Sequence, residues 1–173
     1  MNDVVHVIDD DEAMRDSLSF LLDASGLTAK TYGSAAEFLA VAGDAEPGCV
    51  VTDIRMPEMN GLELVAELKA RGVTLPVIVI TGHGDVPLAV EAMKAGVCDF
   101  LEKPFSDDTL LAAIGRALEG LAETETRQSE ARRISEILDQ LSPREKDVLR
   151  GVVAGKPNKV IAFDLGISPR TVE

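Results

Sequence analysis

Short apolar runs alternate with helical patterns over the first two thirds of the chain. Five runs rich in β-branched residues predict strands, and they are Val4–Ile8, Thr28–Tyr32, Cys49–Thr52, Val77–Ile80 and Val97–Leu101. Several runs are apolar at every position, which is typical of parallel strands covered by helices on both faces. The pattern therefore predicts an α/β fold over residues 1–121, with a doubly wound five-stranded parallel sheet.

Apolar residues at helical spacing fill the segments between these runs. They include Leu18, Leu21 and Leu22 in the first segment and Leu62, Val65 and Leu68 in the third. Gly26 and Gly72 follow these two segments, and glycine often ends a helix because it adopts the left-handed conformation without strain. We therefore expect one helix to end near each of these glycines.

Residues 122–140 contain no glycine or proline and many strong helix formers, so they predict a helical linker. Ile134, Leu138 and Leu141 have the spacing of one apolar seam, but the preceding turns offer mostly Thr, Gln and Arg. This pattern is too short for a long coiled coil. A solvated connecting helix is the favoured interpretation.

Helix start signals define a third region, residues 141–173. Ser142–Glu145 offers a capping serine, a proline at the first helical position and a glutamate that completes a capping box. Asn158 is expected to cap a short helix, Lys159–Leu165, which Gly166 ends. Ser168 and the proline after it then start another helix. The region therefore predicts a small all-α helix-turn-helix domain.

The charge distribution indicates a type of partner, and the cysteine content indicates a cellular compartment. The formal net charge is −13, and residues 142–173 reverse it locally with six basic and four acidic residues. This hints at nucleic-acid contact at that end of the chain only. Cys49 and Cys98 adjoin predicted strands, which indicates free buried thiols in a reducing compartment. The chain shows no signal sequence and no apolar run near the roughly 18 residues that span a bilayer, so a cytoplasmic location without membrane contact is expected.

Polar residues stop four of the apolar runs. These stops are Asp9–Asp11, Asp53, Thr81 and Lys103–Pro104. With strand order 2-1-3-4-5 they share one edge of the sheet, where doubly wound folds bind ligands. Mg²⁺ usually takes one or two carboxylates together with phosphate and water, so Asp10 and Asp53 are expected to face one ion. Negative charge at a helix start is the simpler explanation for the last acid of the cluster and for Glu12.

A carboxylate beside a metal ion can act as a nucleophile and form an acyl phosphate, and Asp53 is the candidate. Lys103 would pair with phosphate oxygens and the Thr81 hydroxyl would donate to them. Pro104 would fix the backbone that aims this lysine, with a cis bond as one option. Each residue also has an ordinary structural explanation by itself, but the set together predicts a phosphoryl site.

Four segments carry a family resemblance: Val7–Asp11, Thr52–Pro57, Ile80–Gly84 and Asp99–Pro104. They resemble the receiver domain of bacterial response regulators, a flavodoxin-like fold, over residues 1–121. The resemblance implies that a histidine kinase phosphorylates Asp53. It also implies that Mg²⁺ is held by Asp10, Asp53 and the Arg55 carbonyl, with Asp9 nearby, and that Thr81 and Phe100 form a switch pair.

Residues 141–173 resemble the LuxR-type helix-turn-helix, so that the whole chain resembles FixJ-type transcriptional regulators. In that family the helix beginning at Ser168 lies in the DNA major groove. The candidate DNA contacts are Lys156, Asn158, Lys159, Arg170 and Thr171. Solvated surface is an equal alternative for each of them. The chain ends at Glu173, inside the expected recognition helix, and we expect it to be a fragment of a longer protein.

Three functions are consistent with these features. The leading one is a transcription regulator in which phosphorylated Asp53 permits receiver dimerisation and DNA binding. The second is a phosphate sink or kinase-binding module without DNA binding. The third is a phosphatase or phosphotransferase, but Ile54 and Arg55 follow the nucleophile and neither is a general acid. The chain is therefore not expected to be an enzyme beyond self-phosphorylation and self-dephosphorylation.

Overall fold

The structure, a computed structural model, describes residues 3–82 and 84–172. The chain divides into two compact units with the boundary between Glu123 and Thr124. The first unit contains β1 (Val4–Ile8), α1 (Glu12–Ala24), β2 (Thr28–Tyr32), α2 (Ala35–Leu39), β3 (Gly48–Asp53), α3 (Gly61–Ala70), β4 (Val77–Thr81), α4 (Val86–Ala95), β5 (Asp99–Glu102) and the start of α5 (Asp107–Asp139). The second contains the end of α5, then α6 (Pro143–Val153), α7 (Asn158–Leu165) and α8 (Pro169–Val172).

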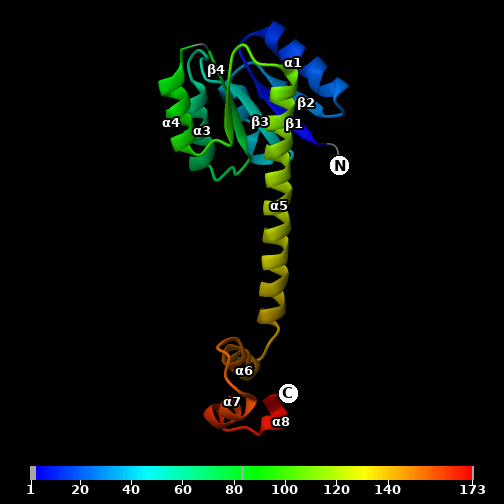
Figure 1. Ribbon diagram of the computed structural model, residues 1–173, viewed down its shortest axis with the longest axis vertical. Coiled ribbons are helices and arrows are strands. Elements are labelled where there is room, and N and C mark those ends of the chain that lie inside the picture. Colours follow the sequence, from blue (N-terminus) through cyan, green and yellow to red (C-terminus); the bar gives the residue numbers. More distant parts are fainter. Residues whose placement is uncertain (1–2, 83, 173) are drawn as a thin grey trace. The chain divides into compact units, whose positions relative to one another are not determined.

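The five strands form one parallel sheet in the order β2-β1-β3-β4-β5 (Figure 1). This confirms the predicted strand order and the doubly wound fold. β1 pairs with β3 so that Val7 lies opposite Val51, and β3 pairs with β4 so that Asp53 lies opposite Ile80. Since every strand runs in the same direction, the carboxyl ends of β1, β3, β4 and β5 meet at one edge.

Alternating side chains of the strands build a separate core on each face of the sheet. On one face Val50 and Val79 pack with residues of α2, α3 and α4. On the other face Val51 and Ile80 pack with residues of α1 and α5. Each fully buried aliphatic side chain contributes about 1.5–3 kcal/mol. Burial on both faces explains why these strands are apolar at every position.

Local signals define the ends of the first helices as predicted. The Asp11 carboxylate accepts from the Ala13 N–H at 2.9 Å and caps α1, an interaction worth about 1 kcal/mol. Gly26 and Gly72 have φ angles of 79° and 73° directly after the ends of α1 and α3. Left-handed backbone at these positions favours glycine over any residue with a side chain.

The fifth strand differs from its prediction. It begins at Asp99, two residues later than expected, because α4 ends in a left-handed Gly96 and the chain needs Val97 and Cys98 to reach the sheet. Val97 is buried, but Cys98 lies in the turn and is exposed. The prediction that both thiols are buried is therefore wrong for Cys98. It holds for Cys49, where burial raises the thiol pKa to about 12.

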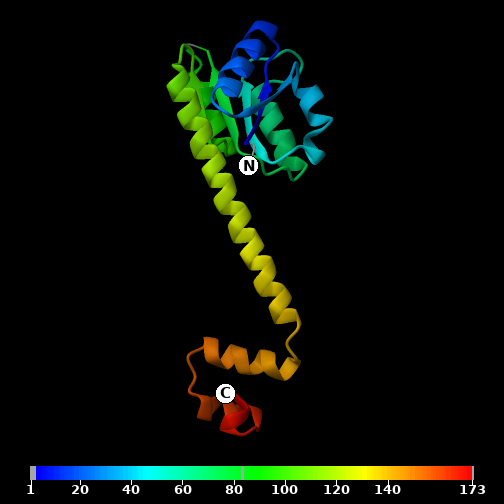
Figure 2. The same cartoon turned by 90° about the vertical axis from the view of Figure 1, so that its right-hand side faces the viewer.

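The predicted linker is helical, but it is not a separate element. It continues the last helix of the first unit, so that α5 is a single helix of 33 residues (Figure 2). The side chains along residues 122–137 are exposed or half-buried, and Ile134 and Ile137 are exposed. This agrees with a solvated helix.

Three helices follow in the second unit. Ser142 and Glu145 form the predicted capping box of α6. Asn158 was expected to cap α7, but it is the first helical residue and Pro157 occupies the cap position. Proline already has the extended backbone that the cap position needs, so the helix begins one residue earlier. Gly166, with φ at 65°, ends α7 as predicted.

Within residues 3–82 and 84–172, no helix combines the length and the apolar character that crossing a bilayer requires.

A buried histidine lies in the central part of the sheet. His6 on β1 is fully buried, and its Nε2 is 2.8 Å from the Glu46 carbonyl oxygen. Its Nδ1 is 3.2 Å from the Tyr32 hydroxyl, and the Phe38 ring packs with its centroid 5.4 Å away. A carbonyl can only accept, so Nε2 carries the proton and the neutral ring accepts from Tyr32 at Nδ1.

Burial lowers the pKa of His6, and the positive charge of Lys30 acts in the same direction. The hydrogen bond to the Glu46 carbonyl and the Glu46 carboxylate oppose this shift without cancelling it. The folded protein therefore resists protonation of His6.

We predict that the free energy of unfolding falls as the pH is lowered through about 6.5, the ordinary histidine value. Below that pH the unfolded chain binds a proton that the folded chain refuses, which costs up to about 1.4 kcal/mol per pH unit. Urea unfolding at a series of pH values measures this slope. His6→Gln should remove this component, while His83→Gln, a change of the second histidine in the sequence, should retain it. Equal slopes in wild type and His6→Gln would contradict the assignment.

Candidate functional site

The polar residues predicted from the strand ends meet at one edge of the sheet. Asp9 follows β1, Asp53 ends β3 and Thr81 ends β4. Lys103 directly follows β5, and its peptide bond to Pro104 is cis. Four chain segments far apart in sequence therefore contribute to one site.

Asp53 is held by two hydrogen bonds from different loops. The Lys103 ammonium is 2.9 Å from Oδ2, and the Arg55 backbone N–H donates to Oδ1 at 3.0 Å. Partial burial lowers the pKa of Lys103, but the Asp53 hydrogen bond and negative charge outweigh burial, so the pKa is raised. Lys103 therefore remains a cation beside Asp53.

Asp9 is the second carboxylate of the site, and it is buried to 2 % exposure. Its Oδ1 accepts from the Asp11 N–H at 2.9 Å, while Oδ2 is buried with no hydrogen-bond partner among the described residues. Burial raises the pKa of Asp9, and the nearby negative charge of Asp53 adds to this shift. A buried oxygen without a partner costs free energy, so Oδ2 is suited to a cation.

The other predicted metal ligands are Asp10, Asp53 and the Arg55 carbonyl. Asp10 is exposed, and in the described part of the chain no three acidic, histidine or cysteine side chains converge as ligands of one ion. Mg²⁺ does not need such a cluster, because it commonly keeps several waters and uses one or two carboxylates. The donors present, the neighbouring carboxylates of Asp9 and Asp53 with Asp9 Oδ2 unpartnered, fit a hard divalent cation.

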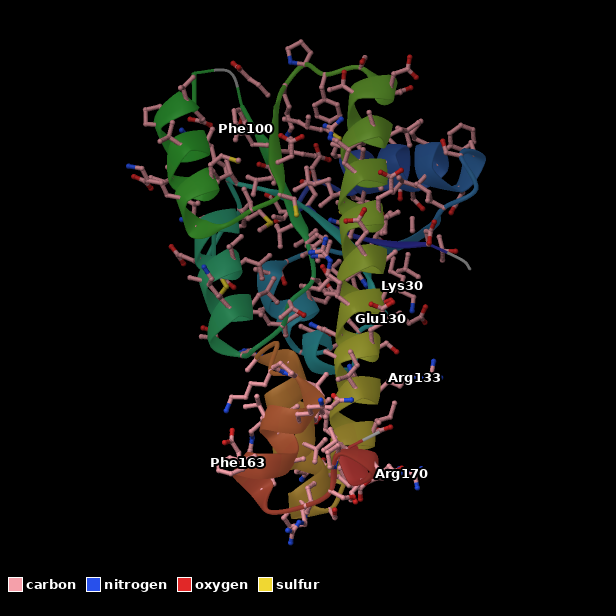
Figure 3. All side chains as sticks on the ribbon, turned by 60° about the horizontal axis from the view of Figure 1, so that its bottom comes forward. Lys30, Phe100, Glu130, Arg133, Phe163 and Arg170 are labelled. Atoms are coloured by element: carbon pink, nitrogen blue, oxygen red, sulfur yellow. The ribbon has the colours of Figure 1, made fainter. Side chains whose placement is uncertain are left out.

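The two predicted switch residues lie on adjacent strands. The Thr81 hydroxyl is buried and donates to the Leu101 carbonyl at 3.3 Å. The Phe100 ring on β5 is 39 % exposed (Figure 3). The structure therefore has the threonine turned toward β5 and the aromatic ring partly in solvent.

An ion pair that the sequence did not predict joins two loops of the site. The Arg55 guanidinium binds both oxygens of Asp85, with Nε to Oδ2 at 2.8 Å and a second bond from Nη2 to Oδ1. The hydrogen bonds from Arg55 lower the pKa of the Asp85 carboxyl. Asp85 directly precedes α4, and its partner is 30 residues away in the sequence, so local sequence patterns did not indicate this pair.

Gly61 is a second residue that shapes the site and that the sequence did not single out. Its N–H donates to the Ile54 carbonyl at 2.9 Å, and Asn60 caps α3 by accepting from the Glu63 N–H. A β-carbon at Gly61 would lie 2.7 Å from the Asp53 carbonyl oxygen and 2.9 Å from Ile54 Cα. The start of α3 therefore packs directly on the backbone that carries Asp53.

The predicted DNA contacts all lie on the surface of the second unit. Lys159, Arg170 and Thr171 are exposed, and Arg170 projects from α8 in Figure 3. Lys156 is exposed but pairs with Asp164 at 3.0 Å. Asn158 is exposed in the first turn of α7. Exposed groups of these types can bind phosphate oxygens or base edges.

Two family models match the chain. Residues 5–115 match the response regulator receiver domain, and residues 139–173 match the bacterial regulatory proteins of the luxR family. The receiver match covers well over half of the chain and contains Asp9, Asp53, Thr81 and Lys103.

The chain is also similar to proteins over nearly its whole length. It is 56 % identical to the transcriptional regulatory protein FixJ of Azorhizobium caulinodans over 98 % of this chain and 80 % of that protein. It is 54 % identical to FixJ of Rhizobium meliloti over 98 % of this chain and 83 % of that protein. The solved structure of full-length FixJ from B. japonicum has a TM-score of 0.71 at 47 % identity, covering 99 % of this chain and 85 % of that one.

We predict that Gly61→Ala slows phosphorylation of the site by roughly tenfold or more, because the added methyl group forces the Asp53 backbone to move. Overpacking at this point should also cost about 1–3 kcal/mol of stability. Intact mass during incubation with acetyl phosphate, together with urea unfolding, measures both effects. Gly115→Ala is the matched control, since its β-carbon meets nothing within 4 Å. Wild-type rates in Gly61→Ala would show that the close contact is unimportant.

Proposed function

The chain belongs to the FixJ-type response regulators, transcriptional regulators with a receiver and a LuxR-type DNA-binding domain, and we propose that phosphorylation of Asp53 switches it. The observation that carries this proposal is the Asp53 carboxylate, held at the sheet edge by Lys103 and by the Arg55 N–H. The Asp53 carboxylate is thus fixed in position. Its neighbour Asp9 is buried, and we assign it to the metal ion. We assign residues 1–121 to the receiver, 122–140 to a helical linker and 141–173 to the DNA-binding domain.

The phosphoryl donor is a phosphohistidine of a sensor histidine kinase. An Asp53 carboxylate oxygen forms the new bond to phosphorus, while the bond between phosphorus and the histidine nitrogen breaks and its electron pair stays on that nitrogen. Lys103 already lies 2.9 Å from Asp53, so its ammonium can bind the phosphoryl oxygens as they arrive. The reaction is a self-phosphorylation that leaves the group on the protein, so the chain is not an enzyme that turns over a substrate.

Mg²⁺ is the expected cofactor, held by Asp9, Asp10, Asp53 and the Arg55 carbonyl. When bound it would offset the negative charge that the phosphoryl group and the acidic side chains bring together. The unpartnered Asp9 Oδ2 and the pKa of Asp9, which burial and the Asp53 charge raise, support this assignment. Asp10 is exposed and would turn toward the ion from the start of α1.

Thr81 and Phe100 transmit the effect of Asp53 phosphorylation to the surface of α4 and β5. A phosphoryl oxygen at Asp53 is a stronger acceptor than the Leu101 carbonyl that Thr81 now binds at 3.3 Å. When the hydroxyl turns toward the phosphoryl group, it vacates space that the half-exposed Phe100 ring can fill. The surface of α4 and β5 then changes, and this surface exposes Val86, Val90 and Met93. Receiver dimerisation through an altered surface would pair two DNA-binding domains on a two-fold site.

A phosphate sink without DNA binding is the less favoured function. The match of residues 139–173 to the luxR family gives the chain an output domain, which a sink does not need. Lys156, Asn158, Lys159, Arg170 and Thr171 are the proposed DNA contacts.

We predict that acetyl phosphate with Mg²⁺ adds one phosphoryl group to the wild-type chain and shifts it from monomer to dimer. Asp53→Asn keeps the side-chain size but cannot form the acyl phosphate, so it should show neither change. Intact mass and light scattering on the same samples measure phosphorylation and association. A mass increase in Asp53→Asn would disprove the assignment of the phosphoacceptor, and phosphorylation without association would favour the sink.

The proposed DNA contacts predict a difference between two lysines. Lys159→Gln should weaken binding to DNA and reduce the slope of log affinity against log salt by about 1, because one phosphate contact is lost. Lys156→Gln should change the slope less, since Lys156 is already neutralised by Asp164. Fluorescence anisotropy with a duplex at several salt concentrations measures both slopes. An unchanged slope in Lys159→Gln would place that residue outside the interface.

A further inference from the structure

The ion pair between Arg55 and Asp85 has no part in the phosphoryl chemistry described above. It nevertheless joins the β3–α3 loop, which leaves the phosphoacceptor, to the β4–α4 loop on the other side of the site. Resting on the proposed function of Asp53 and its metal ion, we propose that Asp85 is a positioning residue: it holds Arg55 so that the Arg55 backbone presents its N–H to Asp53 and its carbonyl to Mg²⁺.

The backbone of Arg55 is tied to the phosphoacceptor at short range. Its N–H donates to Asp53 Oδ1 at 3.0 Å, so a movement of Arg55 moves a hydrogen bond of the reacting carboxylate. Further along the loop the Met59 N–H donates to the Pro57 carbonyl at 2.8 Å. The Gly61 N–H donates to the Ile54 carbonyl at 2.9 Å and closes the loop. Between these points the loop contains Glu58 with φ at 68°, a left-handed conformation that costs free energy in a residue with a side chain. Such a loop needs external contacts to keep one conformation.

Asp85 provides a rigid anchor for that contact. Its side chain is 9 % exposed, its N–H donates to the Gly82 carbonyl, and its own carbonyl accepts from Ala89 in the first turn of α4. The Arg55 side chain is 71 % exposed, so burial does not fix it and the two bonds to Asp85 do. A guanidinium fork bound by both carboxylate oxygens has a defined orientation as well as a favourable energy.

The helix start indicates that the carboxylate is committed to this role. Aspartate at the cap position usually accepts from a backbone N–H of the first helical turn. Asp85 occupies the cap position of α4 but makes no such bond within the described residues, while both of its oxygens bind Arg55. The chain forgoes a helix cap to hold the loop of the phosphoacceptor.

The dependence of the phosphorylation rate on Mg²⁺ concentration distinguishes a positioning role of Asp85 from a general loss of structure. Asp85→Asn removes the charge but keeps the shape, and it should raise the Mg²⁺ concentration for half-maximal phosphorylation by acetyl phosphate about tenfold, the size typical of partners that orient a metal ligand. At saturating Mg²⁺ its rate should return close to the wild-type rate. Arg55→Met removes the same pair from the exposed side, keeps the backbone carbonyl and should give the same shift. The double variant should show no further change.

Two readouts do not depend on phosphorylation. Calorimetric titration with Mg²⁺ alone should show the same loss of affinity in both variants, and hydrogen exchange in metal-free protein should show faster exchange of the Arg55 amide. Glu67→Gln is the matched control, since it breaks the pair of Glu67 with Arg71 at 2.8 Å on the distant end of α3. It should leave all three measurements at wild-type values.

The outcomes distinguish the proposals. If wild type, Asp85→Asn and Arg55→Met have equal Mg²⁺ affinity and equal hydrogen exchange at the backbone amide of residue 55, the positioning role is overturned. Phosphorylation of Asp53 is not affected by that result. Absence of phosphorylation in wild type, with weaker Mg²⁺ binding still found in both variants, would overturn the proposed function and support the positioning role. If Asp85→Asn does not fold, Arg55→Met decides, because it changes an exposed side chain.

Discussion

Charge balance at the carboxyl edge of the parallel sheet constrains the whole receiver unit. The fold brings the ends of β1 and β3 side by side, and therefore Asp9 and Asp53 as well. Lys103 offsets the negative charge of Asp53 directly. Burial raises the pKa of Asp9, and the negative charge of Asp53 adds to that shift. This charge balance is compatible with a stable fold and still favours binding of a cation. Under the proposed function, a phosphoryl group and its metal ion act on the surrounding loops by changing this charge balance.

Contacts of the neighbouring loops fix the position of Asp53 within this charged edge. Gly61 lets the start of α3 lie against the Asp53 carbonyl, and Arg55 connects the phosphoacceptor to the residue before α4. The loop into α3 thus packs on the Asp53 backbone, and the loop into α4 is linked to the Asp53 carboxylate through Arg55. Under the proposed function, a change of charge at Asp53 acts on the starts of α3 and α4 together, and α4 carries the exposed apolar side chains Val86, Val90 and Met93.

The second unit has a different physical basis. Its helices are short, and their ends depend on local devices such as the capping box of Ser142 and Glu145 and the left-handed Gly166. The Arg144 guanidinium also donates to the Leu165 carbonyl at 2.9 Å and so satisfies the end of α7 from α6. The unit has little apolar volume in which to bury side chains, and Ile161 and Ala162 are its buried apolar residues in the described range. Exposed bases on its surface suit the readout of a negatively charged polymer.

The sequence by itself determined the strands and most helix ends, because these follow from local periodicity and from capping residues. The strand order was a premise of the doubly wound fold, and the structure has that order. The sequence also placed Asp9, Asp53, Thr81 and Lys103 at one edge of the sheet, since each directly follows or ends an apolar run. It failed at the start of β5 and at the cap of α7, where the conformations of Gly96 and Pro157 shifted an element by one or two residues.

Only the tertiary structure decided which side chains meet across loops. Nothing in the spacing of Arg55 and Asp85 indicates that they form an ion pair, and nothing in an asparagine-glycine turn indicates that Gly61 touches the backbone of Asp53. Likewise, burial of Asp9 without a partner for Oδ2 depends on atoms from several elements. These contacts arise from packing between distant segments, and local sequence patterns carry no information about that packing.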